Sequence, residues 1–407
     1  MRRRLKILIN FLSYTLEHIL WILPRKKDKW LFGSMGSFMD NPKYLFLSTL
    51  ENHPEINAIW ISHQKKDLPL LKELGLKSYY WLSLKGIYHA LTAKVFIGDH
   101  HVGNINQLLS GGAFFFNLWH GSSVKRVRWQ APEYIVKKYH LKDKSQMRTS
   151  FRFKIEMWPI LFRKADLLLT PSSIQKREFF APMMDVTEEK CIVGVYPRSK
   201  LLIEGKESAM SFISKYEPVE TKRFVESLGM YSKVYVYMPT WRNDSRDFIS
   251  QAEIDWSLLN RVLSERNELF ILKFHPSTKI SLTSIDQYSN IRIYPPVSDI
   301  YTVLPFIDCL ITDYSSIYTD FLMMNKEIIL FVFDYEEYVK GGYELAEYDK
   351  YFVGKRAYSF TQLLSIMKSG EDCHVPQEKY KFLMDFFWDS NKERIDLVEE
   401  VKKRIVL

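Results

Sequence analysis

Residues 113–123, AFFFNLWHGSS, join an apolar run to a histidine on a turn of small residues. The run 113–118 predicts a buried β-strand, so that His120 follows the carboxyl end of that strand. In open α/β sheets, ligands bind at the carboxyl ends of the strands. The stretch therefore predicts an α/β fold with a binding site that includes His120.

Three further polar motifs follow predicted strands in the same way. Pro239-Thr240-Trp241-Arg242 follows residues 234–238, His275-Pro276 follows residues 269–274, and Asp313-Tyr314-Ser315-Ser316 follows residues 309–312. Polar motifs at four strand ends predict one shared cleft, and a shared cleft favours an enzyme over a scaffold.

Strand and helix patterns alternate along the chain, which predicts parallel sheets covered by helices. A chain of 407 residues is too long for one ordinary core, so we expect two domains. We place an amino-terminal helix at 1–27, a first domain at 28–200, a connection at 201–230 and a second domain with terminal helices at 231–407. The helical stretch 377–406 can pack back on the first half. The predicted strands are 29–34, 58–62, 94–98, 113–118, 166–170 and 191–195 in the first domain, and 233–238, 269–274, 291–294, 309–312 and 327–333 in the second.

Positive charge is concentrated in two segments of the chain. The net charge is +9, with +6 in residues 1–29 and +8 in residues 120–154, so the remainder is slightly acidic. Such segments indicate anionic partners, namely a phosphate-rich substrate, anionic lipid or nucleic acid. The three cysteines have no close pairing and predict buried reduced thiols without a zinc site.

The amino-terminal segment has the composition of a membrane-associated helix. Residues 5–23 carry leucine and isoleucine at helical spacing, with Arg2-Arg3-Arg4 before them and Arg25-Lys26-Lys27 after them. Glu17 and His18 make a membrane span costly. We therefore favour an interfacial helix with its basic flanks on anionic lipid over a spanning helix or a helix packed on its own domain.

Two histidines are the candidate catalytic residues. An imidazole titrates near neutrality, so His120 is suited to act as general base on an attacking hydroxyl. His275, which Pro276 restricts to an extended backbone, is expected to bind a phosphate oxygen, protonate a leaving group or orient the base. The alternative for each is a structural histidine, and for His100 and His101 the structural interpretation is favoured.

The last polar motif predicts an anion site. Ser315 and Ser316 open a predicted helix, where backbone N–H groups, the helix dipole and two hydroxyls favour a diphosphate, while Asp313 is expected to orient a donor. The guanidinium of Arg242 suits a phosphate or carboxylate, with a surface salt bridge as the alternative. The other basic candidates, with charge near His120 or weaker support as phosphate ligands, are Lys125, Arg126, Arg128, Arg198 and Lys273.

Several enzyme classes lack their signatures in this sequence. It contains no P-loop, no dinucleotide-binding glycine motif, no zincin motif and no nucleophile-elbow motif, which disfavours kinases, dehydrogenases, zinc proteases and ordinary hydrolases. The basic segment 120–154 carries no aromatic stacking array and no nucleic-acid-binding motif, so a non-catalytic nucleic-acid-binding protein is also disfavoured.

The order and spacing of the motifs resemble the CDP-glycerol glycerophosphotransferase family, which includes teichoic acid primases, polymerases and capsule-polymer relatives. The resemblance implies a GT-B-like fold with two Rossmann-type domains facing a central cleft. It implies transfer of a polyol phosphate, most simply glycerol phosphate, from a CDP-activated donor to an acceptor hydroxyl with release of CMP. It also implies a peripheral protein on the cytoplasmic membrane face. The motifs concerned are Gly36–Lys43, Trp119–Gly121, Gly194–Arg198, Pro239–Arg242, His275-Pro276 and Asp313–Phe321.

The resemblance also implies roles for single residues. His120 and His275 would be the two functional histidines, and the donor phosphates and nucleotide would be bound by Thr240, Arg242, Asp313, Ser315 and Ser316. Lys125, Arg126 and Arg128 would face the acceptor or the membrane. The resemblance implies no metal and no cofactor, a CDP-glycerol or CDP-ribitol donor, and a lipid-linked or polymeric acceptor.

Two stretches depart from the family pattern. Ser122-Ser123-Val124-Lys125 stands where relatives often read Thr-Pro-Leu-Lys, and residues 336–344 differ where relatives carry an Arg-Gly-Phe-like run. The polyol therefore stays open. The alternative function is a GT-B glycosyltransferase that uses a nucleotide sugar, because such an enzyme would share the fold and the phosphate site.

Overall fold

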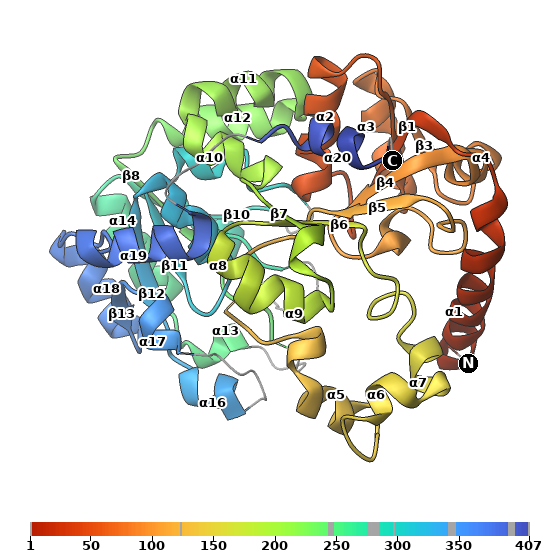
Figure 1. Cartoon of the computed structure of the whole chain (residues 1–407). Coiled ribbons are helices and arrows are strands. Elements are labelled where there is room, and N and C mark those ends of the chain that lie inside the picture. Colours follow the sequence, from red (N-terminus) through yellow and green to blue (C-terminus); the bar gives the residue numbers. More distant parts are fainter. Residues whose placement is uncertain are drawn as a thin grey trace. The chain divides into compact units, whose positions relative to one another are not determined.

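The computed structural model describes residues 2–122, 124–242, 248–275, 278, 285–295, 298–340, 347–389 and 395–405. The chain forms two units, each with its own sheet (Figure 1). Unit 1 comprises Met1–His120, Arg126–Arg198 and Phe386–Leu407, and unit 2 comprises Gly121–Lys125 and Ser199–Asp385. The chain thus passes between the units at four points, whereas sequence analysis predicts one connection at 201–230.

Unit 1 contains a seven-stranded sheet in the order β3-β2-β1-β4-β5-β6-β7, and each neighbouring pair is parallel. The order runs outward in both directions from β1 and β4. The α/β prediction is confirmed for this half, although the short edge strand β3 was missed. The strands are β1 Lys26–Phe32, β2 Asn57–Ser62, β3 Ser78–Tyr80, β4 Ala93–Gly98, β5 Phe114–Asn117, β6 Leu167–Thr170 and β7 Cys191–Val193.

Unit 2 contains a six-stranded parallel sheet in the order β10-β9-β8-β11-β12-β13. Here the order reverses between β8 and β11. The five strands predicted from sequence are present, and β13 was missed. The strands are β8 Lys233–Tyr237, β9 Glu268–Leu272, β10 Ile291–Ile293, β11 Cys309–Thr312, β12 Glu327–Phe331 and β13 Lys355–Ala357.

Helices join successive strands in both units. In unit 1 they are α1 Arg2–Ile19, α2 Asp40–Asn52, α3 Leu68–Glu73, α4 Leu84–Thr92, α5 Pro132–Lys138, α6 Gln146–Thr149, α7 Phe151–Glu156, α8 Ser173–Gln175, α9 Ala181–Met184 and α20 Leu397–Ile405. In unit 2 they are α10 Lys200–Glu204, α11 Lys206–Tyr216, α12 Val219–Leu228, α13 Phe248–Gln251, α14 Trp256–Glu265, α15 Ile317–Phe321, α16 Tyr335–Lys340, α17 Tyr348–Tyr351 and α18 Phe360–Ser369, while α19 Gln377–Trp388 crosses the unit boundary.

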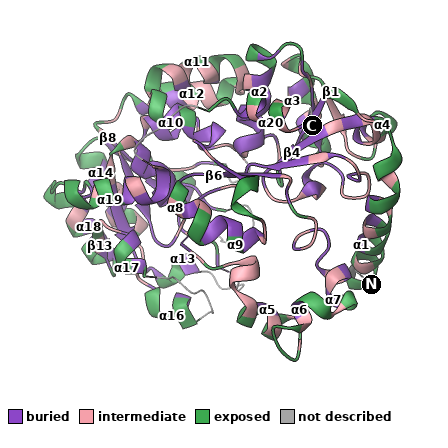
Figure 2. Cartoon of the chain, viewed as in Figure 1, coloured by how far each residue is buried: buried purple, intermediate pink, exposed green. Residues whose placement is uncertain are grey.

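The central strands of each sheet are buried almost throughout, as Figure 2 shows by their colour. Strands covered on both faces read as continuous apolar runs, and FFF at 114–116 and LLL at 167–169 have this form. All three cysteines are buried and unbridged, as expected. The polar residues that follow these strands are therefore distinct in character from the apolar strands themselves.

The amino-terminal helix α1 packs on unit 1 through its polar side. Asn10 Nδ2 donates to Ile155 O at 3.0 Å, and Ser13 Oγ donates to Gln107 O at 2.6 Å. The buried Glu17 carboxylate pairs with Arg163 Nε at 2.9 Å. The exposed apolar side chains of this segment include Leu5, Leu8, Phe11, Leu12, Ile19, Trp21 and Ile22. By length and composition Arg3–Ile22 is also sufficient to cross a membrane, which is weak evidence on its own.

The carboxyl-terminal residues return to unit 1. The division at 231–407 counts them with the second domain, whereas the helical stretch 377–406 is also expected to pack on the first half. Ser172 Oγ donates to Phe386 O at 2.6 Å, and the ring of Trp388 meets that of Tyr196 edge-on at 5.6 Å. His53, at the end of α2, lies 3.1 Å from Asp396, just before α20. These contacts attach the last residues to the first half of the chain.

Candidate active site

In unit 1 the site is set by the ends of β1, β4 and β5. Strands β1 and β4 are neighbours at the point where the strand order reverses, so the loops that follow them leave in opposite directions and open a crevice for ligands. Asp40 follows β1, Asp99 follows β4, and His120 follows β5. The topology therefore gathers these three residues at one edge of the sheet.

The hydrogen bonding of His120 defines its tautomer. Nδ1 lies 2.9 Å from the backbone oxygen of Asp99. Because a carbonyl oxygen only accepts hydrogen bonds, Nδ1 carries the proton and Nε2 of the neutral ring keeps its lone pair. Desolvation lowers the pKa of His120 foremost, and Asp40 partly opposes this shift. A neutral imidazole with a basic Nε2 is the form that a general base requires.

The backbone before His120 is held in an unusual conformation. Trp119 has a φ of +55°, which is rare for a bulky residue, and its ring stacks on that of His120 with centroids 4.2 Å apart. Trp119 N donates to Asn117 Oδ1 at 2.9 Å, and Trp119 O accepts from Asn41 Nδ2 at 2.8 Å. Strained conformations of this kind persist where the surroundings hold them, and they cluster at functional sites.

Arg198 connects His120 with the start of α2. It donates from Nη1 to Asp40 Oδ1 at 2.7 Å and from Nη2 to the backbone oxygen of His120 at 3.0 Å. Sequence analysis named Arg198 as a weak phosphate candidate and gave Asp40 no role. The signal that could have found Asp40 is the run Asp40-Asn41-Pro42, which opens the helix after the first strand.

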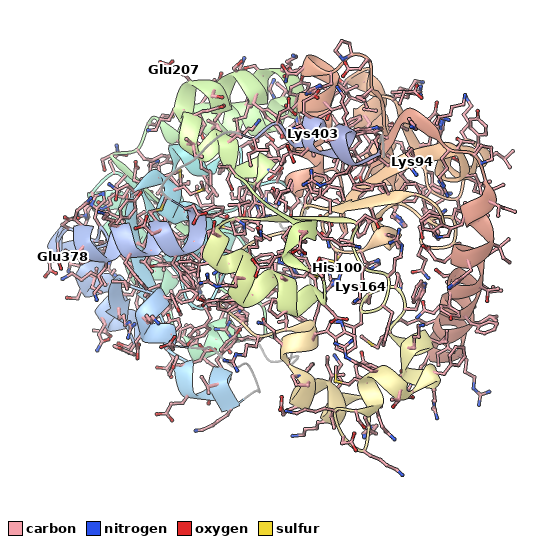
Figure 3. All side chains as sticks on the ribbon, in the orientation of Figure 1. Lys94, His100, Lys164, Glu207, Glu378 and Lys403 are labelled. Carbon is pink, nitrogen blue, oxygen red and sulfur yellow. The ribbon has the colours of Figure 1, made fainter. Side chains whose placement is uncertain are left out.

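Arg128 also lies against the ring of Trp119. Its guanidinium carbon is 4.8 Å from the ring centroid, and Nη2 donates to Nδ1 of His100 at 3.0 Å. Burial lowers the pKa of Arg128 to about 9, and burial together with Arg128 lowers the pKa of His100. His100, which Figure 3 labels, therefore accepts this bond as a neutral ring. The neighbouring Arg126 is exposed.

Lys125 belongs to unit 2, although only four residues separate it from His120 in the sequence. Its Nζ donates to the hydroxyl of Tyr338 at 2.9 Å. Burial lowers the pKa of Lys125 to about 8, with Asp313 raising it and Arg242 lowering it. The structure thus groups Lys125 with the residues predicted to bind the donor. Ser123, in the same segment, lies outside the described residues.

In unit 2 the corresponding reversal lies between β8 and β11, and the motifs after these strands contact each other. Asp313 is fully buried, and its Oδ1 accepts from Thr240 N at 2.8 Å and from Thr240 Oγ1 at 2.6 Å. Its Oδ2 accepts from Arg242 Nη2 at 2.8 Å. The two predicted motifs are therefore joined by a carboxylate.

The guanidinium of Arg242 donates hydrogen bonds to several protein groups. Besides Asp313, it donates from Nε to Asp334 Oδ2 at 2.8 Å and from Nη1 to the backbone oxygen of Thr240 at 2.6 Å. Burial acts to lower the pKa of Arg242, but Asp313 and Asp334 outweigh it and raise the value. This geometry favours a role in holding the loops over direct contact with a phosphate. Asp334 was missed, although it too follows a strand.

Aromatic rings surround the Arg242 side chain. Its guanidinium carbon lies 4.7 Å from the centroid of the Tyr338 ring and 5.2 Å from that of Tyr314, and these two rings stack at 4.2 Å. Tyr314 Oη donates to Asp334 Oδ1 at 3.1 Å. The Tyr314 of the predicted motif thus supports the buried cation rather than a ligand.

The predicted anion site at Ser315 and Ser316 is followed by a short helix. Ser315 is half-buried, Ser316 is exposed, and the helix α15 that follows has only five residues before a 3-10 turn. Because a short helix has a small dipole, an anion here would depend on the hydroxyls and the backbone N–H groups. Their role as donor ligands stays a prediction.

His275 is exposed at the end of β9, with its ring 5.8 Å from the ring of Trp241. Desolvation and Lys273 lower its pKa. Lys273 Nζ donates to the backbone oxygens of Pro295 and Ser298 at 2.7 and 2.8 Å, which gives it a structural role. Pro276 lies outside the described residues.

Two groups of side chains in the described residues have the spacing of a cation site. One is Glu327, Asp372 and His374, and the other is His53, Glu55 and Glu399. Glu327 opens β12 and so lies at the opposite strand ends from the motifs, and it already pairs with Lys233 at 2.5 Å. Lys402 pairs with both Glu55 and Glu399. Neither group contains a predicted site residue.

Known proteins are similar to this chain in sequence and in fold. The chain is 23% identical to the teichoic acid poly(glycerol phosphate) polymerase of Staphylococcus epidermidis over 94% of its own length and 53% of the polymerase. It is also 23% identical to the teichoic acid glycerol-phosphate transferase of Staphylococcus aureus, with 90% of each chain covered. The chain thus spans about half of the first relative and most of the second.

A solved structure of the wall teichoic acid polymerase TagF superposes with a TM-score of 0.69 at 19% identity, covering 100% of this chain and 98% of that one. This likeness shows a GT-B-like fold with two Rossmann-type units, as the sequence predicted. The model of one family matches residues 15–394. The chain therefore belongs to the CDP-glycerol:poly(glycerophosphate) glycerophosphotransferase family.

Proposed function

We propose that this protein is a transferase that moves a polyol phosphate, glycerol phosphate foremost, from a CDP-activated donor to an acceptor hydroxyl in teichoic acid or capsule-type polymer synthesis. Family membership supports the reaction class, and the relatives named above are a polymerase and a transferase of glycerol phosphate. The observation that carries the proposal is His120, whose Nδ1 is bound to Asp99 O and whose Nε2 is the basic atom.

In the proposed mechanism His120 Nε2 takes the proton of the acceptor hydroxyl. The acceptor oxygen then forms a bond to the phosphorus that carries the polyol, and the bond from that phosphorus to the bridging oxygen breaks. CMP leaves with the bridging oxygen and its electron pair, and His275 is the candidate to donate a proton to it. Catalysis of this type depends chiefly on positioning and on stabilising phosphate charge.

The donor phosphates are proposed to bind in unit 2. Ser315 and Ser316 supply hydroxyl and backbone donors at the end of β11, and Lys125 supplies a cation beside Tyr338. Arg242 and Asp313 hold the loops after β8 and β11 in place. Three relatives are named as ribitol-phosphate polymerases, so CDP-ribitol is the second donor to test.

We further propose that the protein associates peripherally with the cytoplasmic face of the cell membrane. The support is helix α1, whose polar side is bound to unit 1 while Leu5, Leu8 and Leu12 are exposed. Basic residues flank this apolar surface at both ends. Apolar side chains beside lysine and arginine suit an anionic lipid surface.

The test is a donor comparison with purified protein and a lipid-linked acceptor that ends in a free hydroxyl. CDP-glycerol, CDP-ribitol and nucleotide sugars are supplied separately, and released nucleotide is measured by chromatography. The proposal expects CMP from a CDP-polyol and loss of that signal in His120→Ala. Nucleotide release from a sugar donor, without CMP from any CDP-polyol, would establish the glycosyltransferase alternative instead.

A further inference from the structure

We propose that Asp40 is a positioning residue that stabilises the protonated imidazole of His120, and that Arg198 fixes Asp40 for this role. The inference rests on the proposed function, in which His120 is the general base. It concerns two residues to which sequence analysis gave no catalytic part. The argument depends on contacts that lie wholly within unit 1.

The first step is the shared arginine. Arg198 donates to Asp40 Oδ1 at 2.7 Å and to His120 O at 3.0 Å, and its side chain is 3% exposed. One rigid, planar guanidinium therefore fixes the carboxylate of Asp40 relative to the backbone of His120. A buried fork of this kind restricts both partners more strongly than a surface ion pair would.

The second step concerns Asn41, the residue next to Asp40, which bonds to Trp119 and to Arg198. Asn41 Nδ2 donates to Trp119 O at 2.8 Å, and Asn41 Oδ1 accepts from the backbone N–H of Arg198 at 3.3 Å. Asp40 itself has a φ of +62°, and Trp119 has a φ of +55°. The side chains of Asn41 and Arg198 thus link these two strained residues, which indicates a constraint on the position of His120.

The third step concerns the charge around the ring. Burial and the neighbouring Asp40 raise the pKa of Asp99 well above its ordinary value, which favours the neutral form of Asp99. The other groups that face His120 are cationic or neutral. Arg128 lowers its pKa, and the ring of His100 meets it edge-on at 5.6 Å. Asp40 is thus the carboxylate that raises the pKa of His120, and the backbone oxygen of Asp99 acts in the same direction.

The sign of the effect follows from these charges. Asp40 raises the pKa of His120, whereas Arg198 lowers it. Loss of the Asp40 carboxylate should lower the pKa of His120, and loss of the Arg198 cation should raise it. Two variants of one ion pair are thus expected to move the same group in opposite directions, which simple misfolding would not do.

The experiment measures the titration midpoint of His120 by NMR on protein labelled with 13C-histidine, with the signal assigned by its absence in His120→Gln. Asp40→Asn should shift the midpoint to lower pH by about 1 pH unit, and Asp40→Glu should restore it. Arg198→Met should shift it to higher pH. Asp28→Asn is the matched control, since Asp28 is an exposed carboxylate near the opposite end of β1, and its midpoint should equal that of the wild type.

A second readout uses the reaction itself. The acid limb of kcat/KM for CMP release should follow the midpoint to lower pH in Asp40→Asn, and the plateau should fall about tenfold because the base is weaker. An unchanged midpoint in both Asp40→Asn and Arg198→Met would overturn the inference. The midpoint needs no turnover, so a chain that releases no CMP from any donor would refute the proposed function while this measurement still decides the role of Asp40.

Discussion

Arg242 Nη2 and Asp313 Oδ2 lie 2.8 Å apart, with both side chains almost fully removed from solvent. Asp334 binds the same guanidinium from the end of β12. A buried cation between two buried carboxylates stabilises the loops only while all three groups are present. The pair therefore joins the loops after β8 and β11, the second of which carries the proposed donor ligands Ser315 and Ser316.

Replacement of Arg242 by methionine is expected to destabilise unit 2 by about 3–5 kcal/mol, because two buried carboxylates lose their cation. Urea denaturation followed by tryptophan fluorescence measures this. Lys340→Met, which removes the exposed partner of Glu336, is the control and should change the midpoint little. Equal midpoints for the two variants would show that the Arg242 cluster contributes little to stability.

His120→Gln is expected to reduce CMP release by about 100-fold or more while the fold and donor binding persist, because only the base is lost. His275→Ala is expected to reduce release to a similar degree if it protonates CMP. Stopped assays of CMP and calorimetric binding of the donor separate the two effects. A His120→Gln enzyme with wild-type turnover would remove this residue as the base.

The pH dependence of the wild type gives a separate prediction. Desolvation lowers the pKa of His120, and activity is lost only as the pH falls through that pKa and the base becomes protonated. The acid limb of kcat/KM should therefore lie below about 6.5, the ordinary value of histidine. A limb above that value would point to a different base.

Lys125 should contribute to donor affinity as a cation. Because burial lowers its pKa to about 8, donor affinity should weaken as the pH rises through that value, since the neutral amine attracts phosphate less. In Lys125→Arg the loss should move to higher pH, and Arg126→Gln should behave as wild type. Calorimetry across pH measures this, and identical profiles for wild type and Lys125→Arg would count against the role.

Membrane binding is expected to depend on the exposed side of α1. The double variant Leu8→Asp, Leu12→Asp should sediment about tenfold less, or lower still, with vesicles that contain phosphatidylglycerol. The reason is that charged side chains replace apolar side chains that the membrane would bury. Replacement of Arg3, Arg4 and Lys6 by glutamine should weaken binding chiefly at low salt. Lys72→Gln, on α3, serves as the charge control. Unchanged binding of the double aspartate variant would show that another surface of the protein contacts the membrane.

Much of this fold was predictable because its strands are continuous apolar runs and its motifs follow them directly. The missed strands β3 and β13 have three residues each and carry partly exposed side chains, so they lack that signal. The positions of His120, Asp313 and Ser315 at strand ends followed from the same pattern. Local sequence was therefore sufficient to predict most of the strands and the residues that follow them.

The partners of the site residues were not predictable, because they come from distant parts of the chain. Asp334 binds a guanidinium 92 residues away, and Arg198 binds a carboxylate 158 residues away. Glu17 was interpreted as an obstacle to a membrane span, yet its partner Arg163 makes it the attachment point of α1. Such pairings depend on the register of the sheet and not on local composition.

The return of the last residues to unit 1 determines how this protein can be dissected. A fragment that stops at residue 198 would lose the backbone oxygen that Ser172 binds and the ring that covers Tyr196. Expression of the halves as separate pieces would therefore require the terminal segment to be grafted back by a linker or supplied as a peptide. Evolutionary exchange of one half for another would meet the same obstacle.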